Sequence, residues 1–549
     1  MRNTISGQVF AEMIFCASAA LDENRQQLNE LNVFPVPDGD TGTNMSLTMS
    51  AAAAALHGRT PSAVGDAADT AASALLRGAR GNSGVILSLL FRGLAKSLRG
   101  KAECSAADWA KAMCDGVDAA YKAVMKPAEG TVLTVSRCAS EAAVERSKAG
   151  VTDIEELLTD ALAVARETLA KTVDMNPVLK KAGVVDAGGQ GYVVILNAML
   201  LCLQGKFVAK APVTETKTSA EFSAINDEEI TFTYCTEFIV AREKKRDPEL
   251  LRSFLESLGD SLVLVEDDDI IKVHVHTDAP GRALTEALRY GPLQTVKIEN
   301  MRNQHTSLAD KETAAPAPAQ PEAEPEIAPA EKEVGFVAVC AGDGMADLFR
   351  SLGADRIVTG GQTMNPSTDD ILREVNKTPA STVFVFPNNK NIIMAAEQCI
   401  PLTEKTVRVI PTRTVPQGVA ALAYMDPDQS PDDLEESFKE SAARVHTALV
   451  TYAARDSDYD GHIIHAGEYL ALLDGKLLGS YASLPTLLKE LNWAFGELEP
   501  EFLTVYYGQD VTETDANGVA ESLTSCFPEA DVSLVSGGQP VYYYMIAAE

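Results

Sequence analysis

Two carboxylates stand two residues apart in the stretch FPVPDGDTGTNM, residues 34–45, at Asp38 and Asp40. Like charges this close repel each other, so a cation between them is expected. A calcium EF-hand loop does not match, because Gly42 stands at its third side-chain ligand position and Met49 at its bidentate glutamate. Magnesium suits the pair better, since it takes one or two carboxylates and completes its shell with water and phosphate oxygens. A solvated turn that caps the next helix is the alternative, and this loop alone leaves both open.

Four glycine- or hydroxyl-rich loops each lead into a predicted helix, where exposed backbone N–H groups bind anions well. Capping alone explains one such loop, whereas four in one helical region suggest a shared rim around a phosphorylated ligand. No GxxxxGK[ST] motif and no kinase HRD or DFG motif occurs, so a P-loop and a protein-kinase site are excluded. The four loops are residues 38–44 (DGDTGTN), 81–84 (GNSG), 126–137 (KPAEGTVLTVSR) and 175–196 (MNPVLKKAGVVDAGGQGYVVIL).

A second candidate site lies in KVHVHT, where His274 and His276 alternate with valines. Strand periodicity places both histidines on one face, where they form a good chelating pair. Cys235, in the earlier stretch TYCTEF, is a soft third ligand, and such a set suits zinc. The alternative is a strand with a polar face and a buried thiol, and the spacing alone favours that alternative.

The elements that must position these residues differ along the chain. Residues 1–205 are rich in Ala, Leu and Glu, and stretches such as 105–125 and 153–173 have helical periodicity, which predicts an all-α domain. Residues 226–302 predict a small α/β domain, because strand-like segments flank the helical stretch PELLRSFLESLG. Residues 307–333, rich in Pro, Ala and Glu, predict an extended linker.

Residues 334–549 predict a larger α/β region. Four short apolar segments alternate with helical stretches, which indicates a parallel sheet over 334–425. A helix over 433–453 and further strand pairs are expected after it. The loops 359–371, 386–392 and 410–418 each follow a predicted strand, and the carboxyl ends of parallel strands form the usual binding edge of such a sheet.

Composition and charge exclude several classes of function. The 549 residues include 47 Lys and Arg against 78 Asp and Glu, and the net charge of −31 argues against nucleic acid and anionic lipid as direct ligands. The longest apolar run, 192–203, is too short to span a bilayer, so no integral membrane segment is expected. An N-terminus without a signal-peptide run and nine cysteines without paired spacing predict a cytoplasmic protein with free thiols.

The stretches PVPDGDTGTNM, RGNSGVILS, PAEGTVLTV and AGVVDAGGQGY together resemble the fatty acid kinase family, in its ATP-binding component. The N-terminal domain of that family is similar to the ADP-binding subunit of bacterial dihydroxyacetone kinase, and the resemblance covers essentially the whole chain. It implies a multidomain fold: an all-α helical barrel (DhaL-like, or DAK2) with nucleotide at one end, a small α/β middle domain and a DegV-like α/β C-terminal region.

The same resemblance implies roles for individual residues. Asp38 and Asp40 would hold two magnesium ions that bridge the ATP phosphates. The dihydroxyacetone kinase protein has a third aspartate shortly upstream, where this chain offers only Asn32 as a substitute ligand. Family middle domains carry a Cys and His-x-His metal site, which implies zinc at the set named above. Phosphate contacts are implied for Thr43, Asn44, Asn82, Ser83 and Gly84, and contacts around the ribose and base for Thr131, Asp186 and Gly188.

The implied activity is an ATP-dependent kinase that phosphorylates the carboxylate of a fatty acid. A separate DegV-type fatty-acid-binding protein would present the acid, giving acyl phosphate for phospholipid synthesis. A carboxylic acid is already ionised at neutral pH and needs no general base. The C-terminal region would dock this partner, the linker would bring it to the ATP site, and a homodimer is implied. Two alternatives stay open, a dihydroxyacetone-like small-metabolite kinase and a nucleotide-sensing scaffold.

Overall fold

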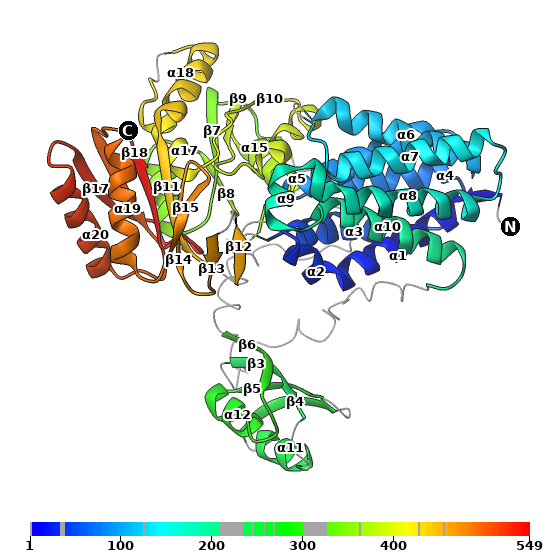
Figure 1. Ribbon diagram of the computed structural model, residues 1–549, viewed down its shortest axis with the longest axis horizontal. Helices are drawn as coiled ribbons and strands as arrows, with labels where there is room; N and C mark the ends of the chain where they lie inside the picture. Colours follow the sequence, from blue (N-terminus) through cyan, green and yellow to red (C-terminus); the bar gives the residue numbers. More distant parts are fainter. Residues whose placement is uncertain are drawn as a thin grey trace. The chain divides into compact units, whose positions relative to one another are not determined.

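The structure, a computed structural model of the 549-residue chain, divides into two units. The first unit combines residues 1–212 with 324–549, and the second comprises residues 213–323 (Figure 1). The N-terminal and C-terminal parts of the chain thus belong to one unit. The structure describes residues 3–32, 39–124, 127–207, 234–242, 246, 248–256, 258–266, 270–300, 327–361, 364–426, 429–453, 456–459 and 462–549.

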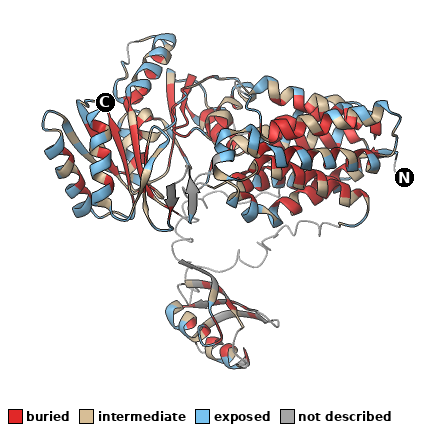
Figure 2. Cartoon of the chain, in the orientation of Figure 1, coloured by how far each residue is buried: buried red, intermediate tan, exposed pale blue. Residues whose placement is uncertain are grey.

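The N-terminal part of the first unit is helical, as the sequence predicts. Fully buried alanines such as Ala67, Ala71 and Ala161 let neighbouring helices approach closely, and Figure 2 shows buried residues along the facing sides of these helices. A short antiparallel pair joins β1 (Thr4–Ser6) to β2 (Glu103–Ser105). The helices are α1 (Gly7–Glu23), α2 (Arg25–Glu30), α3 (Thr41–Leu56), α4 (Val64–Arg77), α5 (Gly81–Leu98), α6 (Ala106–Ala123), α7 (Val132–Lys148), α8 (Ile154–Met175), α9 (Pro177–Ala182) and α10 (Ala187–Leu203).

Local capping residues explain where several of these helices begin. Ser105 and Asp108 form a reciprocal capping box at the start of α6, and Asp153 caps α8. The N-cap residues of α3 and α5 are Asp40 and Arg80, and neither side chain makes a capping hydrogen bond. An arginine has no acceptor atom and cannot cap a helix N-terminus. Both of these helix starts are ones that the sequence assigns to phosphate binding, and neither N-cap side chain uses their first N–H groups.

The C-terminal part of the first unit is α/β. Its helices are α14 (Asp343–Ser351), α15 (Thr368–Lys377), α16 (Ile393–Glu397), α17 (Val415–Ala423), α18 (Pro431–Arg444), α19 (Leu484–Gly496) and α20 (Glu513–Cys526), with a 3₁₀ turn at Ile400–Leu402. Its strands are β7 (Lys332–Cys340), β8 (Arg356–Thr359), β9 (Ala380–Phe386), β10 (Thr406–Val409), β11 (His446–Tyr452), β12 (Ser457–Tyr459), β13 (His462–Ile464), β14 (Tyr469–Leu473), β15 (Lys476–Tyr481), β16 (Phe502–Tyr507), β17 (Asp531–Ser536) and β18 (Tyr544–Ala548).

These strands form two main sheets and a small hairpin, β12–β13. The first sheet has the order β10-β9-β7-β8 and is parallel throughout, which confirms the parallel sheet predicted over 334–425. The second has the order β15-β14-β11-β18-β16-β17 and is antiparallel except for the pair β16–β17. A cluster of four aromatic rings, with centroids 5.2–6.4 Å apart, packs between β7, β9 and α18: Phe336, Phe384, Phe386 and Phe438.

The helix predicted over 433–453 is wrong in its second half. The helix α18 ends at Arg444, and the next residues form β11, which pairs antiparallel with β14 and β18. Thr447, Val450 and Thr451 are buried at the centre of this sheet, where β-branched side chains pack well. A strand buried on both faces shows no alternation, so its apolar run resembled a continuing helix.

In its described residues, the second unit is a four-stranded antiparallel sheet with two helices. The strand order is β4-β5-β3-β6, and buried Phe238, Val273 and Val275 form its core with Leu251 and Tyr290. Its elements are β3 (Tyr234–Ala241), α11 (Pro248–Glu256), β4 (Gly259–Glu266), β5 (Ile270–Thr277), α12 (Pro280–Ala287) and β6 (Leu293–Asn300). Residues 307–326 of the predicted linker lie outside the described residues. None of the described helices is both long and apolar enough to cross a membrane.

Candidate functional site

The starts of α3 and α5 lie against each other. A Cβ atom built on Gly81 would stand 2.4 Å from Asn44 Nδ2, and one on Gly84 would stand 2.3 Å from Thr48 Oγ1, so the contact depends on glycine. The Thr48 hydroxyl donates to Asn44 O at 2.6 Å and accepts from Arg80 N at 3.2 Å. The first two predicted phosphate loops are therefore held together at one place.

Two asparagines at the end of α2 hold the start of α3. Asn29 Oδ1 accepts from Thr43 N at 3.1 Å, and Asn29 Nδ2 donates to Thr43 Oγ1 at 3.0 Å. Asn32 Oδ1 accepts from the Thr41 hydroxyl at 2.8 Å. A Cβ atom on Gly39 would stand 3.7 Å from Asn32 Cβ, so Asn32 lies beside the acidic loop. Sequence reasoning missed Asn29, because one polar residue on a short helix carries no distinguishing signal.

The acidic pair itself is described only in part. Asp40 is half-buried at the start of α3, whereas Asp38 lies outside the described residues. Asn365, from the loop between β8 and α15, donates a hydrogen bond from Nδ2 to Asp40 Oδ2. This loop lies within the predicted binding edge, residues 359–371, but nothing in the sequence relates it to the acidic loop.

The starts of α7 and α10 form a second contact. Asp186 caps α10 by accepting from Gly189 N at 2.7 Å, and it also accepts from Val132 N, at the first residue of α7. Burial raises the pKa of Asp186 to about 6, although these two backbone hydrogen bonds oppose the rise. A Cβ atom on Gly188 would stand 3.3 Å from Val132 Cβ. Thr131 is the N-cap residue of α7, so the three residues assigned to ribose and base lie together.

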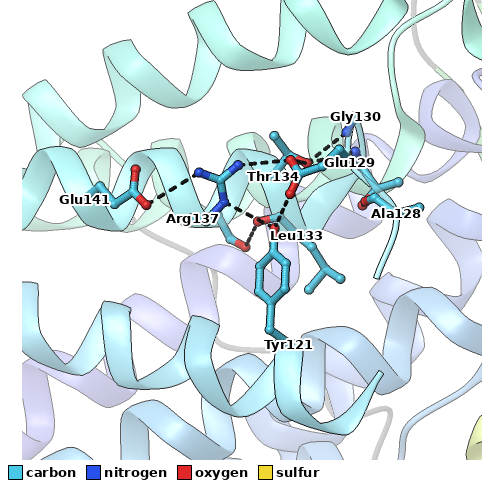
Figure 3. A network of polar contacts seen from close by, with 10 residues as sticks. Tyr121, Ala128, Glu129, Gly130, Leu133, Thr134, Arg137 and Glu141 are labelled. Carbon is cyan, nitrogen blue, oxygen red and sulfur yellow. Dashed lines mark hydrogen bonds and ion pairs between the residues drawn. The ribbon is translucent and has the colours of Figure 1, made fainter. Parts of the chain in front are cut away.

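The loop before α7 is held by a network of polar contacts (Figure 3). Arg137 Nη2 lies 2.9 Å from Glu129 Oε2, and Arg137 Nε donates to the Tyr121 hydroxyl at 3.3 Å. The Thr134 hydroxyl donates to Glu129 Oε2 and accepts from Gly130 N, both at 2.8 Å. The hydrogen bond from Thr134 and then the charge and hydrogen bond of Arg137 lower the pKa of Glu129, although burial opposes them. The carboxylate is therefore ionised and fixes the loop.

The two pairs of helix starts belong to one neighbourhood. A Cβ atom on Gly191, in the second turn of α10, would stand 2.5 Å from Sδ of Met45, in the second turn of α3. Contacts through α3 and α10 thus connect the α3–α5 pair of helix starts to the α7–α10 pair.

The side chains present fit a magnesium–nucleotide ligand. Asp40 supplies a carboxylate, and among the described residues Asn82 Oδ1 and Asn365 Oδ1 are buried oxygens without a hydrogen-bond partner. A bound ion, water or ligand would supply the hydrogen-bond or coordination partner that these two oxygens need. No three His, Cys, Asp or Glu side chains gather as a metal site within the described residues, which do not include Asp38.

The backbone of the second unit brings the predicted zinc ligands into register. Cys235 on β3 stands directly opposite His276 on β5, and His276 stands opposite Asp260 on β4. His274 is two residues back along β5, opposite Glu237. Directly opposite residues of an antiparallel pair share a face of the sheet. The side chains of the cysteine and both histidines lie outside the described part of the structure.

Family models match three consecutive parts of the chain and define a class of three-domain protein. A DAK2 domain model matches residues 35–201, a model for the middle domain of FakA-like fatty acid kinase proteins matches 231–308, and a model for their C-terminal domain matches 335–549. Protein YloV of Bacillus subtilis is 40% identical over 561 residues, which cover 100% of this chain and 99% of YloV. An uncharacterized protein of Staphylococcus epidermidis is 38% identical over 558 residues, covering 100% of both chains. The chain belongs to the FakA-like fatty acid kinase family, which confirms the resemblance seen in the sequence.

Solved structures resemble part of the chain at low scores. A DegV family protein of Corynebacterium glutamicum has a TM-score of 0.30 and 12% identity, covering 39% of this chain and 96% of its own. The Fak B3 protein of Streptococcus pneumoniae, loaded with linoleic acid, has a TM-score of 0.29 and 11% identity, covering 40% and 99%. TM-scores this low establish no common function.

Proposed function

We propose that this chain is an ATP-dependent kinase that phosphorylates the carboxylate of a fatty acid. A separate DegV-type fatty-acid-binding protein presents the acid, and the product is an acyl phosphate used in phospholipid synthesis. The packing of the α5 start against the α3 start, which carries Asp40, is the observation that supports a nucleotide site here. Membership of the FakA-like fatty acid kinase family supports the choice of acceptor.

Different residues of the site would bind the metal, position Thr43 and contact the phosphates. Asp38 and Asp40 would hold magnesium, with Asn32 as a third ligand, and the metal would neutralise phosphate charge during transfer. Asn29 orients the hydroxyl and backbone N–H of Thr43. The uncapped first turn of α5 offers backbone N–H groups to phosphate oxygens. The acceptor carboxylate arrives ionised, so this chain has no proton to remove.

The double variant Asp38→Ala/Asp40→Ala tests the site in an assay with ATP and the lipid-loaded carrier. We expect acyl phosphate formation to be abolished, because the metal ligands are gone. Asp118→Ala, which removes an exposed carboxylate from α6, is the control and should keep full activity. Unchanged turnover by the double variant would contradict the metal roles.

The two alternative functions give different results with the natural chain. Phosphorylation of dihydroxyacetone without any carrier would show a small-metabolite kinase and refute the fatty acid proposal. Nucleotide binding without transfer to either acceptor would show a scaffold. Sedimentation of the purified chain tests the homodimer that the family resemblance implies.

We also propose a zinc site in the second unit, formed by Cys235, His274 and His276. Thiolate and imidazole are common zinc ligands, and the register of β3 and β5 supports the grouping. Asp260 on β4 stands directly opposite His276. It is a candidate for the fourth ligand or for a hydrogen-bond partner of a ligating histidine. Metal analysis of the natural chain should find about one zinc per chain. Cys235→Ser should lose it, and zinc retained at the same ratio would refute the site.

A further inference from the structure

The C-terminal part of the first unit reaches the starts of α3 and α5. Arg80, the residue before α5, forms an isolated antiparallel bridge with Ser367, and Thr368 N donates to Ala79 O at 3.0 Å. The Asn82 side chain contacts Asn391, from the loop after β9, at 3.5 Å. Loops at the carboxyl edge of the parallel sheet therefore lie on the segment that opens α5, which is one of the proposed phosphate loops.

Asn365 contacts the acidic loop and the starts of α3 and α5. The residue is 1% exposed, and its Nδ2 donates to Asp40 Oδ2 and lies 3.5 Å from Asn44 Oδ1. Its backbone oxygen accepts from Arg80 Nη1 at 2.8 Å. Gly81, with φ +55°, leaves room for it, since a Cβ atom there would stand 3.2 Å from Asn365 Nδ2. The side chain is thus held in one orientation by contacts with the helical domain.

The other polar atom of the Asn365 carboxamide is its oxygen, Oδ1. Asn365 Oδ1 is buried and has no hydrogen-bond partner among the described residues. A carbonyl oxygen accepts hydrogen bonds and donates none, so it repels phosphate oxygens and suits a cation or a water bound to one. Its neighbour Asp40 is a proposed magnesium ligand, and partners that orient metal ligands tune the affinity for the metal.

We propose that Asn365 is a positioning residue of the nucleotide–metal site, so that the C-terminal domain completes a site whose other residues come from the helical domain. Its Nδ2 orients the Asp40 carboxylate, and its Oδ1 would accept a hydrogen bond from water on a bound metal. This inference rests on the proposed function, because it requires that the acidic loop binds magnesium with nucleotide.

Calorimetric titration of the full chain with ADP tests the proposal, once with Mg²⁺ and once with EDTA. We expect Asn365→Ala to raise the Kd for ADP in Mg²⁺ by about tenfold, the lower end of the usual effect of a lost metal-orienting partner. The Kd in EDTA should change less than about twofold. Asn376→Ala is the matched control, because Asn376 is a buried asparagine of the same domain. Its side-chain Oδ1 accepts from the Thr403 hydroxyl at 2.6 Å, away from this site.

Each outcome of the titration decides between the two proposals. A Kd in Mg²⁺ within twofold of the natural value, or a lower one, overturns the role of Asn365, and so does an equal loss in Mg²⁺ and EDTA. If Asn365→Ala fails to fold, Asn365→Leu keeps the side-chain volume and should show the same magnesium-specific loss. If the natural chain binds no ADP in Mg²⁺, the proposed function fails and this inference falls with it. If the natural chain binds ADP and the Asn365 variants bind it equally, this inference alone fails.

Discussion

Arg80 Nη2 lies 3.3 Å from Asp370 Oδ2, an ion pair that joins the segment before α5 to the first turn of α15. Burial disfavours the Asp370 charge, yet hydrogen bonds from Ser367 and the charges of Arg80 and Arg373 outweigh it and lower the pKa of Asp370. The pair is therefore charged at neutral pH. It holds the C-terminal domain against the loop that opens α5.

Loss of this pair should destabilise the first unit. Arg80→Leu removes the pair and the hydrogen bond to Asn365 O, and we expect a loss of about 1–3 kcal/mol in the free energy of unfolding. The control is Arg99→Leu, whose pair with Asp69 has side chains 69% and 40% exposed, against 24% and 35% for Arg80 and Asp370. Exposed pairs contribute about 0–1 kcal/mol. Urea unfolding compares the two variants, and equal losses would contradict a structural role for Arg80.

Asn29 should matter for nucleotide affinity although it is not expected to touch the nucleotide. Asn29→Ala removes two hydrogen bonds to Thr43, each worth about 1 kcal/mol, so Thr43 loses its fixed orientation. We expect the Kd for ADP in Mg²⁺ to rise roughly tenfold. Gln26→Ala, which breaks an exposed contact with Glu30 on the same helix, should leave it unchanged. A Kd for Asn29→Ala equal to the control would refute this role.

Gly42 should tolerate no side chain. A Cβ atom there would stand 2.1 Å from Arg25 O and 2.8 Å from Leu28 Cβ, so Gly42→Ala forces α2 away from α3. We expect a loss of stability of about 1–3 kcal/mol or more. Gly518→Ala in α20 is the matched control, because nothing lies within 4 Å of the added atom. Alanine is the better helix former, so the control should gain up to about 1 kcal/mol. Thermal unfolding followed by circular dichroism measures both variants.

Asp186 should make stability depend on pH. Burial raises its pKa from 3.8 to about 6, so the folded state binds the proton more tightly than the unfolded state. The stabilisation this provides is present below about pH 4 and is lost as the pH rises through about 6. The melting temperature of the natural chain should therefore fall relative to that of Asp186→Asn as the pH rises from 5 to 7. Measurements below pH 5 are avoided because the chain approaches zero net charge near its pI of about 4.6. A flat difference would contradict the raised pKa.

Local features were the ones that sequence reasoning could predict. The four loops could be predicted because glycine and hydroxyl residues before a helix shape its start in the same way in any fold. The parallel sheet could be predicted because its strands are short apolar runs between helical stretches. The boundary at Arg444 was missed, because the strand that follows is buried on both faces and has no period-two pattern.

The sequence by itself determined that four glycine- or hydroxyl-rich loops precede helices and that two carboxylates stand two residues apart, because glycine conformation, helix capping and charge spacing act over a few residues. The tertiary structure decided which of these loops meet and what else joins them. Asn365 and Arg80 are far apart in the chain, and neither has a local pattern that marks it. Their roles arise because the carboxyl edge of the parallel sheet packs on the start of α5. Packing of this kind depends on long-range burial and shape, which no short stretch of sequence contains.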